Sequence, residues 1–199
     1  MRVFAYCCES FAAATERAAG VRPVLSPPMA AEFMPPRALE GYDLLYFDLH
    51  GAPGEAFWRG DGGIVALRAE QIPRLATLAR NDGGEESARN DGTRQGPVVF
   101  AASCYLGDDD SPMLDAFLQA GAWYVIGGTG ENWGPRGGRL YGAPLLGLWL
   151  RRWMEVGFET LLALALAKQT VRVVSRGGMA VEDTLGFRAY ERNRTDWEV

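Results

Sequence analysis

The sequence predicts an α/β domain, a three-layer sandwich in which helices cover both faces of a mostly parallel central sheet. Near-continuous apolar runs at 44–49 and 97–102 are typical of strands that are buried on both faces. Segments with helical spacing alternate with these strands, which favours parallel strands joined by right-handed crossovers. The length of 199 residues fits one core, so we expect a single domain over 1–199.

The amino-terminal part predicts a strand, a helix and a long loop. The apolar segment from Met1 to Cys8 predicts the strand, and the Ala-rich run from Phe11 to Ala19 predicts a helix that ends at Gly20. The Pro-rich stretch 23–36 cannot be one continuous helix or a central strand, because proline lacks an N–H donor and has a fixed φ. We therefore expect a surface loop there.

The middle of the chain holds the two buried strands and the segment between them. His50 directly follows the first of these strands. Apolar residues at helical spacing predict a helix over 69–80, and the polar, Gly-rich stretch 81–96 predicts a flexible loop. The second buried strand, 97–102, lies just before Cys104.

The carboxyl-terminal part continues the alternation of helices and strands. Ser111 can cap a helix that opens with Pro112 and stops at Gly121. The sequence then predicts a strand at 122–126, a Gly-rich loop at 127–138, helices at 145–156 and 158–168, and a short strand at 171–174.

Charge and hydropathy exclude two classes of partner. The net charge of −5 argues against a nucleic-acid binder, because phosphate binding needs clustered Lys and Arg, which are scattered in this chain. The first residues lack the long apolar run of a signal peptide, and the stretch from Leu161 to Ala167 is too short to cross a bilayer. We therefore expect a cytoplasmic protein that binds neither nucleic acid nor membrane.

Cysteine and histidine are scarce, which narrows the chemistry. The odd number of cysteines, and the opposite directions of adjacent Cys7 and Cys8 in a strand, argue against a disulfide framework and leave Cys104 free. Zinc sites usually draw on several Cys and His ligands at short spacing, and His50 is the only histidine. We therefore expect no metal and no cofactor.

His50 and Cys104 are the candidate catalytic residues. In parallel sheets ligands bind outside the carboxyl ends of the strands, and each of these residues follows such an end. A cysteine hydrolase needs an imidazole that accepts the thiol proton and later protonates the leaving amine. The amides of Gly51 and Cys104 could donate to the oxyanion that forms during acyl transfer.

The segments around these residues resemble a known family. Residues 42–51 read YDLLYFDLHG and residues 98–104 read VVFAASC, so that a buried strand precedes first His-Gly and then Cys. This order resembles the caspase-like cysteine peptidases, most closely their CHAT branch, which is related to separase. Residues 114–126, LDAFLQAGAWYVI, are similar to the CHAT pattern that follows the cysteine, and the resemblance covers roughly 42–169.

The resemblance implies a caspase-like cysteine endopeptidase. His50 would be the general base, Cys104 the nucleophile that forms a thioester, and the Gly51 and Cys104 amides the oxyanion hole. A peptide or protein would be the substrate, and small CHAT-type domains resemble effectors that wait for an activating or regulatory protein. Some caspases mature by cleavage of an exposed linker, so the 81–96 loop is either a site of self-cleavage or a simple flexible insertion, which explains its composition equally well.

Two departures from the family affect the substrate pocket. Caspases and metacaspases carry Gln or Asp two places before the nucleophile, where this chain has Ala102, so no residue preference is implied. The usual Trp-containing turn after the next strand is replaced by 127–133, which leaves Trp133 as a candidate lining residue. This Gly-rich loop lacks the Lys-Ser/Thr of a phosphate-binding P-loop, which favours a pocket wall.

Two aspartates near the dyad have alternative interpretations. Asp48 lies on the same side of its strand as His50 and either orients the imidazole, binds a basic substrate group, or is simply a hydrogen-bonded strand-end carboxylate. Asp108, with the two aspartates after it, either selects a cationic substrate group or is solvated charge before a helix.

The sequence is also compatible with two other functions. The chain could be a catalytically silent caspase-like module that binds peptides or acts as a scaffold in a regulatory or defence assembly. A glutamine amidotransferase fits less well, because that class places its histidine after the nucleophile, and no histidine follows Cys104.

Overall fold

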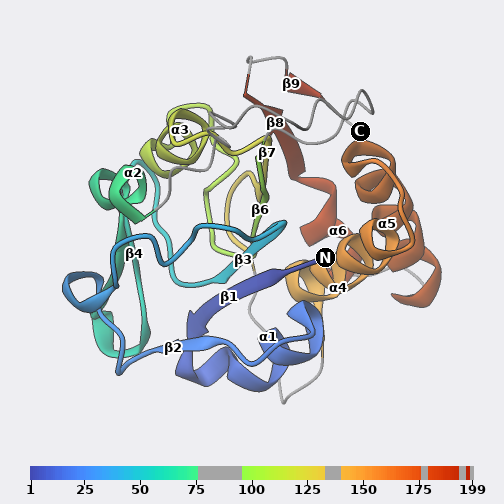
Figure 1. The fold of residues 1–199 in the computed structure, drawn as a ribbon. Helices are drawn as coiled ribbons and strands as arrows, with labels where there is room; N and C mark the ends of the chain where they lie inside the picture. Colours follow the sequence, from blue (N-terminus) through green and yellow to red (C-terminus); the bar gives the residue numbers. More distant parts are fainter. Residues whose placement is uncertain (76–95, 133–139, 176–178, 193–195, 198–199) are drawn as a thin grey trace, which may run out of the picture.

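The computed structural model describes residues 1–75, 96–132, 140–175, 179–192 and 196–197 (Figure 1). Within these residues the main sheet has seven strands in the order β2-β1-β3-β6-β7-β8-β9. The strands are β1 (Val3–Cys8), β2 (Val24–Ser26), β3 (Leu44–Asp48), β6 (Val98–Ala101), β7 (Tyr124–Gly128), β8 (Phe187–Glu191) and β9 (Asp196–Trp197). The first five run parallel, and β8 and β9 pair antiparallel to their neighbours.

Helices lie on both faces of this sheet, as expected for a three-layer α/β arrangement (Figure 1). One face carries α1 (Ala12–Ala19), α4 (Gly142–Glu155), α5 (Thr160–Ser175) and α6 (Met179–Leu185). The other face carries α2 (Ile72–Leu75), α3 (Pro112–Gln119) and a hairpin of β4 (Phe57–Arg59) and β5 (Val65–Arg68). The predicted α/β class with a mostly parallel sheet is confirmed.

The strands of the sheet centre are apolar on both sides because they contribute to two cores. In β3, Leu45 and Phe47 belong to the core under the hairpin and α3. Leu44 and Tyr46 point the other way, into the core under α1, α4 and α5. All five residues of β3 are buried, which explains its uninterrupted apolar sequence.

Local signals set several helix ends as predicted. The Ser111 hydroxyl accepts a hydrogen bond from the Leu114 amide at 3.4 Å, and Pro112 occupies the first turn of α3. Gly20 ends α1 in the left-handed region at φ 73°, a conformation that is easy for a residue without Cβ.

Three predicted elements differ from the structure. The predicted strand at 171–174 is the last turn of α5, so this prediction is wrong. The Pro-rich stretch 23–36 includes β2, a strand that pairs with β1 and, among the described strands, lies at the edge of the sheet. The strand predicted at 122–126 is shifted, because β7 extends to Gly128, inside the predicted Gly-rich loop.

Two predicted segments between the central strands lie partly outside the described residues. The helix predicted over 69–80 is present as a short 3-10 turn, Ala69–Gln71, followed by α2, and the rest of it lies outside the described residues. Of the predicted flexible loop, residues 81–95 also lie outside them. Among the helices that the structure does describe, none has the length and apolar character needed to cross a membrane.

Candidate active site

The ends of β3 and β6 bring the two predicted catalytic segments together. These strands are parallel neighbours, with Phe47 paired to Ala101, so both carboxyl ends lie at one edge of the sheet. The Leu49 amide donates to the Ser103 hydroxyl at 3.1 Å across this edge. A Cβ on Gly51 would lie 2.5 Å from the Cys104 carbonyl oxygen, so the two backbones touch there. The convergence of the His-Gly and Cys segments was predictable from the strand-end rule.

His50 is held by its backbone and has an exposed side chain. Its amide and carbonyl each form a 2.8 Å hydrogen bond with Arg59, which ties the residue to β4. The imidazole lies edge-on to Phe11, with ring centroids 5.3 Å apart, and 51% of the side chain is exposed. Its Nε2 is 3.7 Å from Oδ1 of Asp61. This leaves an accessible imidazole whose backbone is fixed.

Cys104 is partly buried, and its sulfur contacts the segment after β7. The Asn132 amide donates to Sγ at 3.2 Å, while the Asn132 side chain donates to the Ser103 carbonyl at 2.9 Å. Burial is the main reason that the pKa of Cys104 is raised, and Glu131 adds to it, although the Asn132 bond acts in the opposite direction. At neutral pH the resting sulfur is therefore a thiol.

The thiol and the imidazole are not in direct contact. Within the described residues, the interactions of Cys104 Sγ are with Asn132, and those of the His50 ring are with Phe11 and Asp61. No hydrogen bond among them joins the sulfur to a ring nitrogen. A dyad in this state would need the substrate, or a side-chain rotation, to complete it.

Backbone pairing fixes the chain that follows Cys104. Tyr105 has φ 60°, an uncommon value for a residue with a side chain, and its amide donates to the Gly130 carbonyl at 2.8 Å. The Gly107 amide donates to the Gly128 carbonyl at 3.0 Å. The post-cysteine loop is thus clamped to the Gly-rich segment, which forms one wall beside the sulfur.

An acidic pocket lies where these two segments continue. It has a volume of about 490 Å³ and is lined by Gly107, Asp108, Asp109, Asp110, Thr129 and Arg188. Asp108 Oδ1 accepts a hydrogen bond from the Gly130 amide at 3.2 Å, and partial burial raises the pKa of this carboxyl. Asp108 therefore lines a cavity formed partly by the loop that follows Cys104, whereas Trp133, the other predicted pocket residue, lies outside the described residues.

Asp48 is separated from the exposed edge. Only 2% of it is exposed, and its carboxylate accepts a hydrogen bond from the Thr15 hydroxyl of α1 at 3.0 Å. Burial raises its pKa to about 7, even though the Thr15 bond lowers it. Of its predicted alternatives, this geometry matches the hydrogen-bonded strand-end carboxylate, and it leaves no surface for a substrate to contact.

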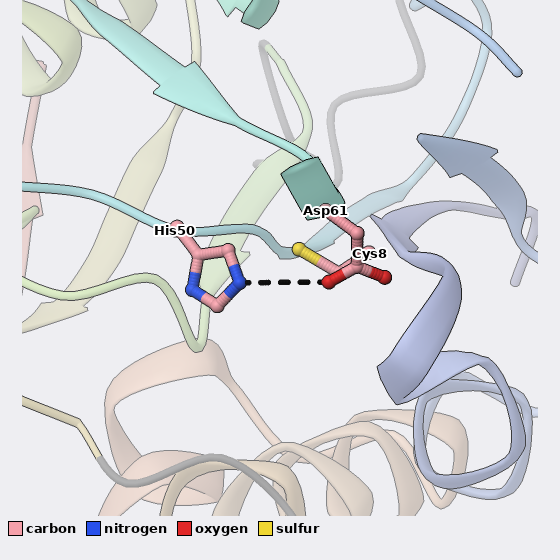
Figure 2. A group of neighbouring side chains, drawn as sticks. All are labelled: Cys8, His50 and Asp61. Atoms are coloured by element: carbon pink, nitrogen blue, oxygen red, sulfur yellow. Dashed lines mark ion pairs between the residues drawn. The ribbon is translucent and has the colours of Figure 1, made fainter. Parts of the chain in front are cut away.

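Two residues that sequence reasoning did not select lie next to His50. Cys8 ends β1, and Asp61 begins a 3-10 turn, Asp61–Gly63, that follows β4 (Figure 2). Their ligand atoms and a His50 ring nitrogen all lie within 4.8 Å of one another. Cys8 carried a usable signal, because it also follows the strand-end rule, but Asp61 is brought here by a hairpin that the sequence did not predict.

The fold and this edge together define an open α/β protein with a candidate site at the carboxyl ends of its central parallel strands. A comparison with protein-family models finds no match to the chain, and a comparison with curated proteins finds no significant one. Function is therefore inferred from the geometry of the site.

Proposed function

We propose that this protein is a caspase-like cysteine endopeptidase with Cys104 as nucleophile and His50 as general base. The observation that supports it most is the contact between Gly51 and the Cys104 carbonyl, 2.5 Å from the position a Cβ would take. It sets a His-Gly segment directly against a cysteine that follows the adjacent parallel strand. Acyl-transfer sites need a base, a nucleophile and oxyanion donors in one place, and this contact brings the segments that carry them together.

In the proposed reaction, Sγ of Cys104 attacks the peptide carbonyl carbon while its proton passes to the His50 imidazole. The Gly51 and Cys104 amides donate to the oxyanion of the tetrahedral intermediate. Collapse of this intermediate breaks the C–N bond, and the amine leaves with the proton from His50. Water, deprotonated by His50, then hydrolyses the thioester and restores the thiol.

The tautomer of His50 follows from its neighbour in this proposal. Nε2 faces the Asp61 carboxylate at 3.7 Å, so a proton on Nε2 is favoured there. The lone pair is then on Nδ1, which becomes the atom that accepts the thiol proton. Because the pKa of Cys104 is raised, a base is required to generate the thiolate.

Peptide cleavage by matched variants tests this proposal. We expect the wild-type protein to cleave members of a peptide library, and Cys104→Ala and His50→Ala to lose this activity. Cys7→Ala is the control, because Cys7 is a fully buried thiol in β1 that takes no part in the reaction. Cleavage that survives Cys104→Ala would disprove the assignment of the nucleophile.

A catalytically silent module is the second candidate. It is favoured by the raised pKa of Cys104 and by the lack of a bond between its sulfur and His50 in the described residues. A peptide with an electrophilic warhead distinguishes the two, with mass spectrometry as readout. The peptidase is expected to become modified at Cys104, whereas a silent module would bind the peptide reversibly and stay unmodified.

A further inference from the structure

Cys8, His50 and Asp61 converge from three separate parts of the chain (Figure 2). Cys8 comes from the end of β1, His50 from the segment after β3, and Asp61 from the turn after β4. One ligand atom of each lies within 4.8 Å of the other two, and the His50 to Asp61 distance is 3.7 Å. Thiolate sulfur, imidazole nitrogen and carboxylate oxygen are the donors that zinc uses in proteins.

The spacing is close to that of a tetrahedral zinc centre. With zinc–ligand bonds of about 2.0–2.3 Å, neighbouring ligand atoms of a tetrahedron are about 3.3–3.8 Å apart. The His50 to Asp61 pair already lies in this range at 3.7 Å. The other separations, at most 4.8 Å, need to shorten by roughly 1 Å, which side-chain torsions can supply.

The backbone and neighbouring groups hold the three donors in place. The amide and the hydroxyl of Ser10 both donate to the Asp61 carboxylate, at 2.7 and 2.8 Å. Cys8 ends β1, and two hydrogen bonds to Arg59 fix the His50 backbone. Partners of this kind, outside the donor set, orient metal ligands and strengthen binding.

The donor set also leaves a side open to solvent. Cys8 is fully buried, whereas 51% of the His50 side chain and 31% of the Asp61 side chain are exposed. An ion can therefore reach the site from the surface. Three protein donors leave the fourth position of a tetrahedron for water or another ligand.

We propose that Cys8, His50 and Asp61 form a Zn²⁺ site that holds the His50 imidazole away from its role as general base. On binding, Zn²⁺ takes the Nε2 lone pair of His50, an Asp61 oxygen and the Cys8 thiolate, and the Cys8 proton passes to solvent. The one proton of neutral His50 then resides on Nδ1, so no ring lone pair remains to deprotonate Cys104.

Zinc binding and the inhibition of cleavage by zinc depend on different premises. Zinc binding rests only on the three donors and holds for a silent module as well as for a peptidase. The inhibition of peptide cleavage rests on the proposed function, because it needs His50 to act as the base. The experiment therefore measures binding and cleavage separately.

Binding is tested with the full chain after treatment with a chelator. We expect titration calorimetry to show one Zn²⁺ per chain, and Co²⁺ to produce thiolate-to-cobalt charge-transfer absorption. Cys8→Ala should abolish that absorption, and Asp61→Asn, a substitution at a partly exposed residue, should weaken Zn²⁺ binding at least about tenfold. Cys7→Ala and Cys104→Ala are the matched thiol controls and should bind Zn²⁺ like the wild type.

Three results would overturn the zinc site. One is no saturable Zn²⁺ binding by the wild type, and another is unchanged binding by Asp61→Asn. The third is binding that survives Cys8→Ala but is lost in Cys104→Ala, because the ion would then bridge His50 and Cys104 instead.

Inhibition is tested on any peptide whose cleavage depends on Cys104. Zn²⁺ should stop cleavage by the wild type over the concentration range in which it binds. For Cys8→Ala, compared with its own metal-free rate, inhibition should need at least about ten times more Zn²⁺. Zinc bound without inhibition would disprove the switch. If no peptide is cleaved, the proposed function fails while the binding data still decide the site.

Discussion

Gly51 is the residue on which the candidate site depends most at the atomic scale. A methyl group at this position would meet the Cys104 carbonyl oxygen at 2.5 Å, and that atom belongs to the backbone and cannot rotate away. Any larger residue must separate the two strand ends. In the proposed reaction, such a separation would also displace the oxyanion donors.

We therefore expect Gly51→Ala to reduce kcat/KM at least about a hundredfold, the effect typical of losing one oxyanion donor. Overpacking should also lower the free energy of unfolding by about 1–3 kcal/mol. Peptide cleavage and urea denaturation measure the two effects. Gly54→Ala is the control, because its new methyl group meets open space, although its φ of 66° carries a strain of its own. Equal kcat/KM in the two variants would contradict the role given to Gly51.

At the residue scale the sequence located the strand-end residues and missed their neighbours. His50, Gly51 and Cys104 were predictable because the direction of a parallel strand determines where its end lies. Asp61 was not selected, because the short β4–β5 hairpin that folds it back onto His50 was not predicted, although Asp61-Gly62 is a hairpin turn sequence. Cys8 was predicted only as the end of an apolar strand; it is fully buried, and its sulfur also faces the site edge.

At the scale of elements, the position of α4 depends on one small residue. Gly147 lies over Tyr46 and Phe100, and a Cβ there would come within 2.6 Å of both rings. The helix therefore lies close to β3 and β6, the strands that lead to His50 and Cys104. Both rings are fully buried, so neither can move without disturbing the core.

For this reason we expect Gly147→Ala to destabilise the fold. Overpacking should cost about 1–3 kcal/mol, and the better helix propensity of alanine should recover about 1 kcal/mol of it. Urea denaturation should give a net loss of up to ~2 kcal/mol. Arg152→Ala, on the exposed side of the same helix, should change stability by less than about 0.5 kcal/mol. A more stable Gly147→Ala protein would show that α4 can move away from the sheet.

The elements that the sequence mispredicted or missed have two physical causes. Residues 171–174 contain three valines, which favour strands by local propensity, but Val171 is buried in the core of the helical layer and extends α5. The connection of the β4–β5 hairpin contains a turn signal, Asp61-Gly62-Gly63, but its strands are only three and four residues long, too short for an alternating pattern to identify them. Local propensity misled the first prediction and short strands hid the hairpin, whereas the uninterrupted apolar runs of the buried central strands identified them.

At the scale of the whole molecule, the chain carries a net negative charge, and one of its pockets is lined mainly by aspartates. The net charge is −5, and the pocket lined by the loop after Cys104 contains three aspartates and one arginine. Field lines concentrate in such a cleft and raise the local concentration of cations. If the proposed peptidase uses this pocket, Arg or Lys before the cleaved bond is the side chain that its charge favours.

We expect kcat/KM for an Arg-containing peptide to exceed that for the same peptide with citrulline, which keeps the shape and lacks the charge. The Arg peptide should lose several-fold in kcat/KM when ionic strength rises from about 0.01 to about 0.15 M, because the screening length shortens from about 30 to about 8 Å. The citrulline peptide should change little, and Asp109→Asn should flatten the salt dependence of the Arg peptide. Equal kcat/KM for the two peptides at low salt would contradict the use of this pocket. Asp108, Asp109 and Asp110 line it, so a substrate group that enters it must be bound differently when it is a cation than when it is the neutral isostere.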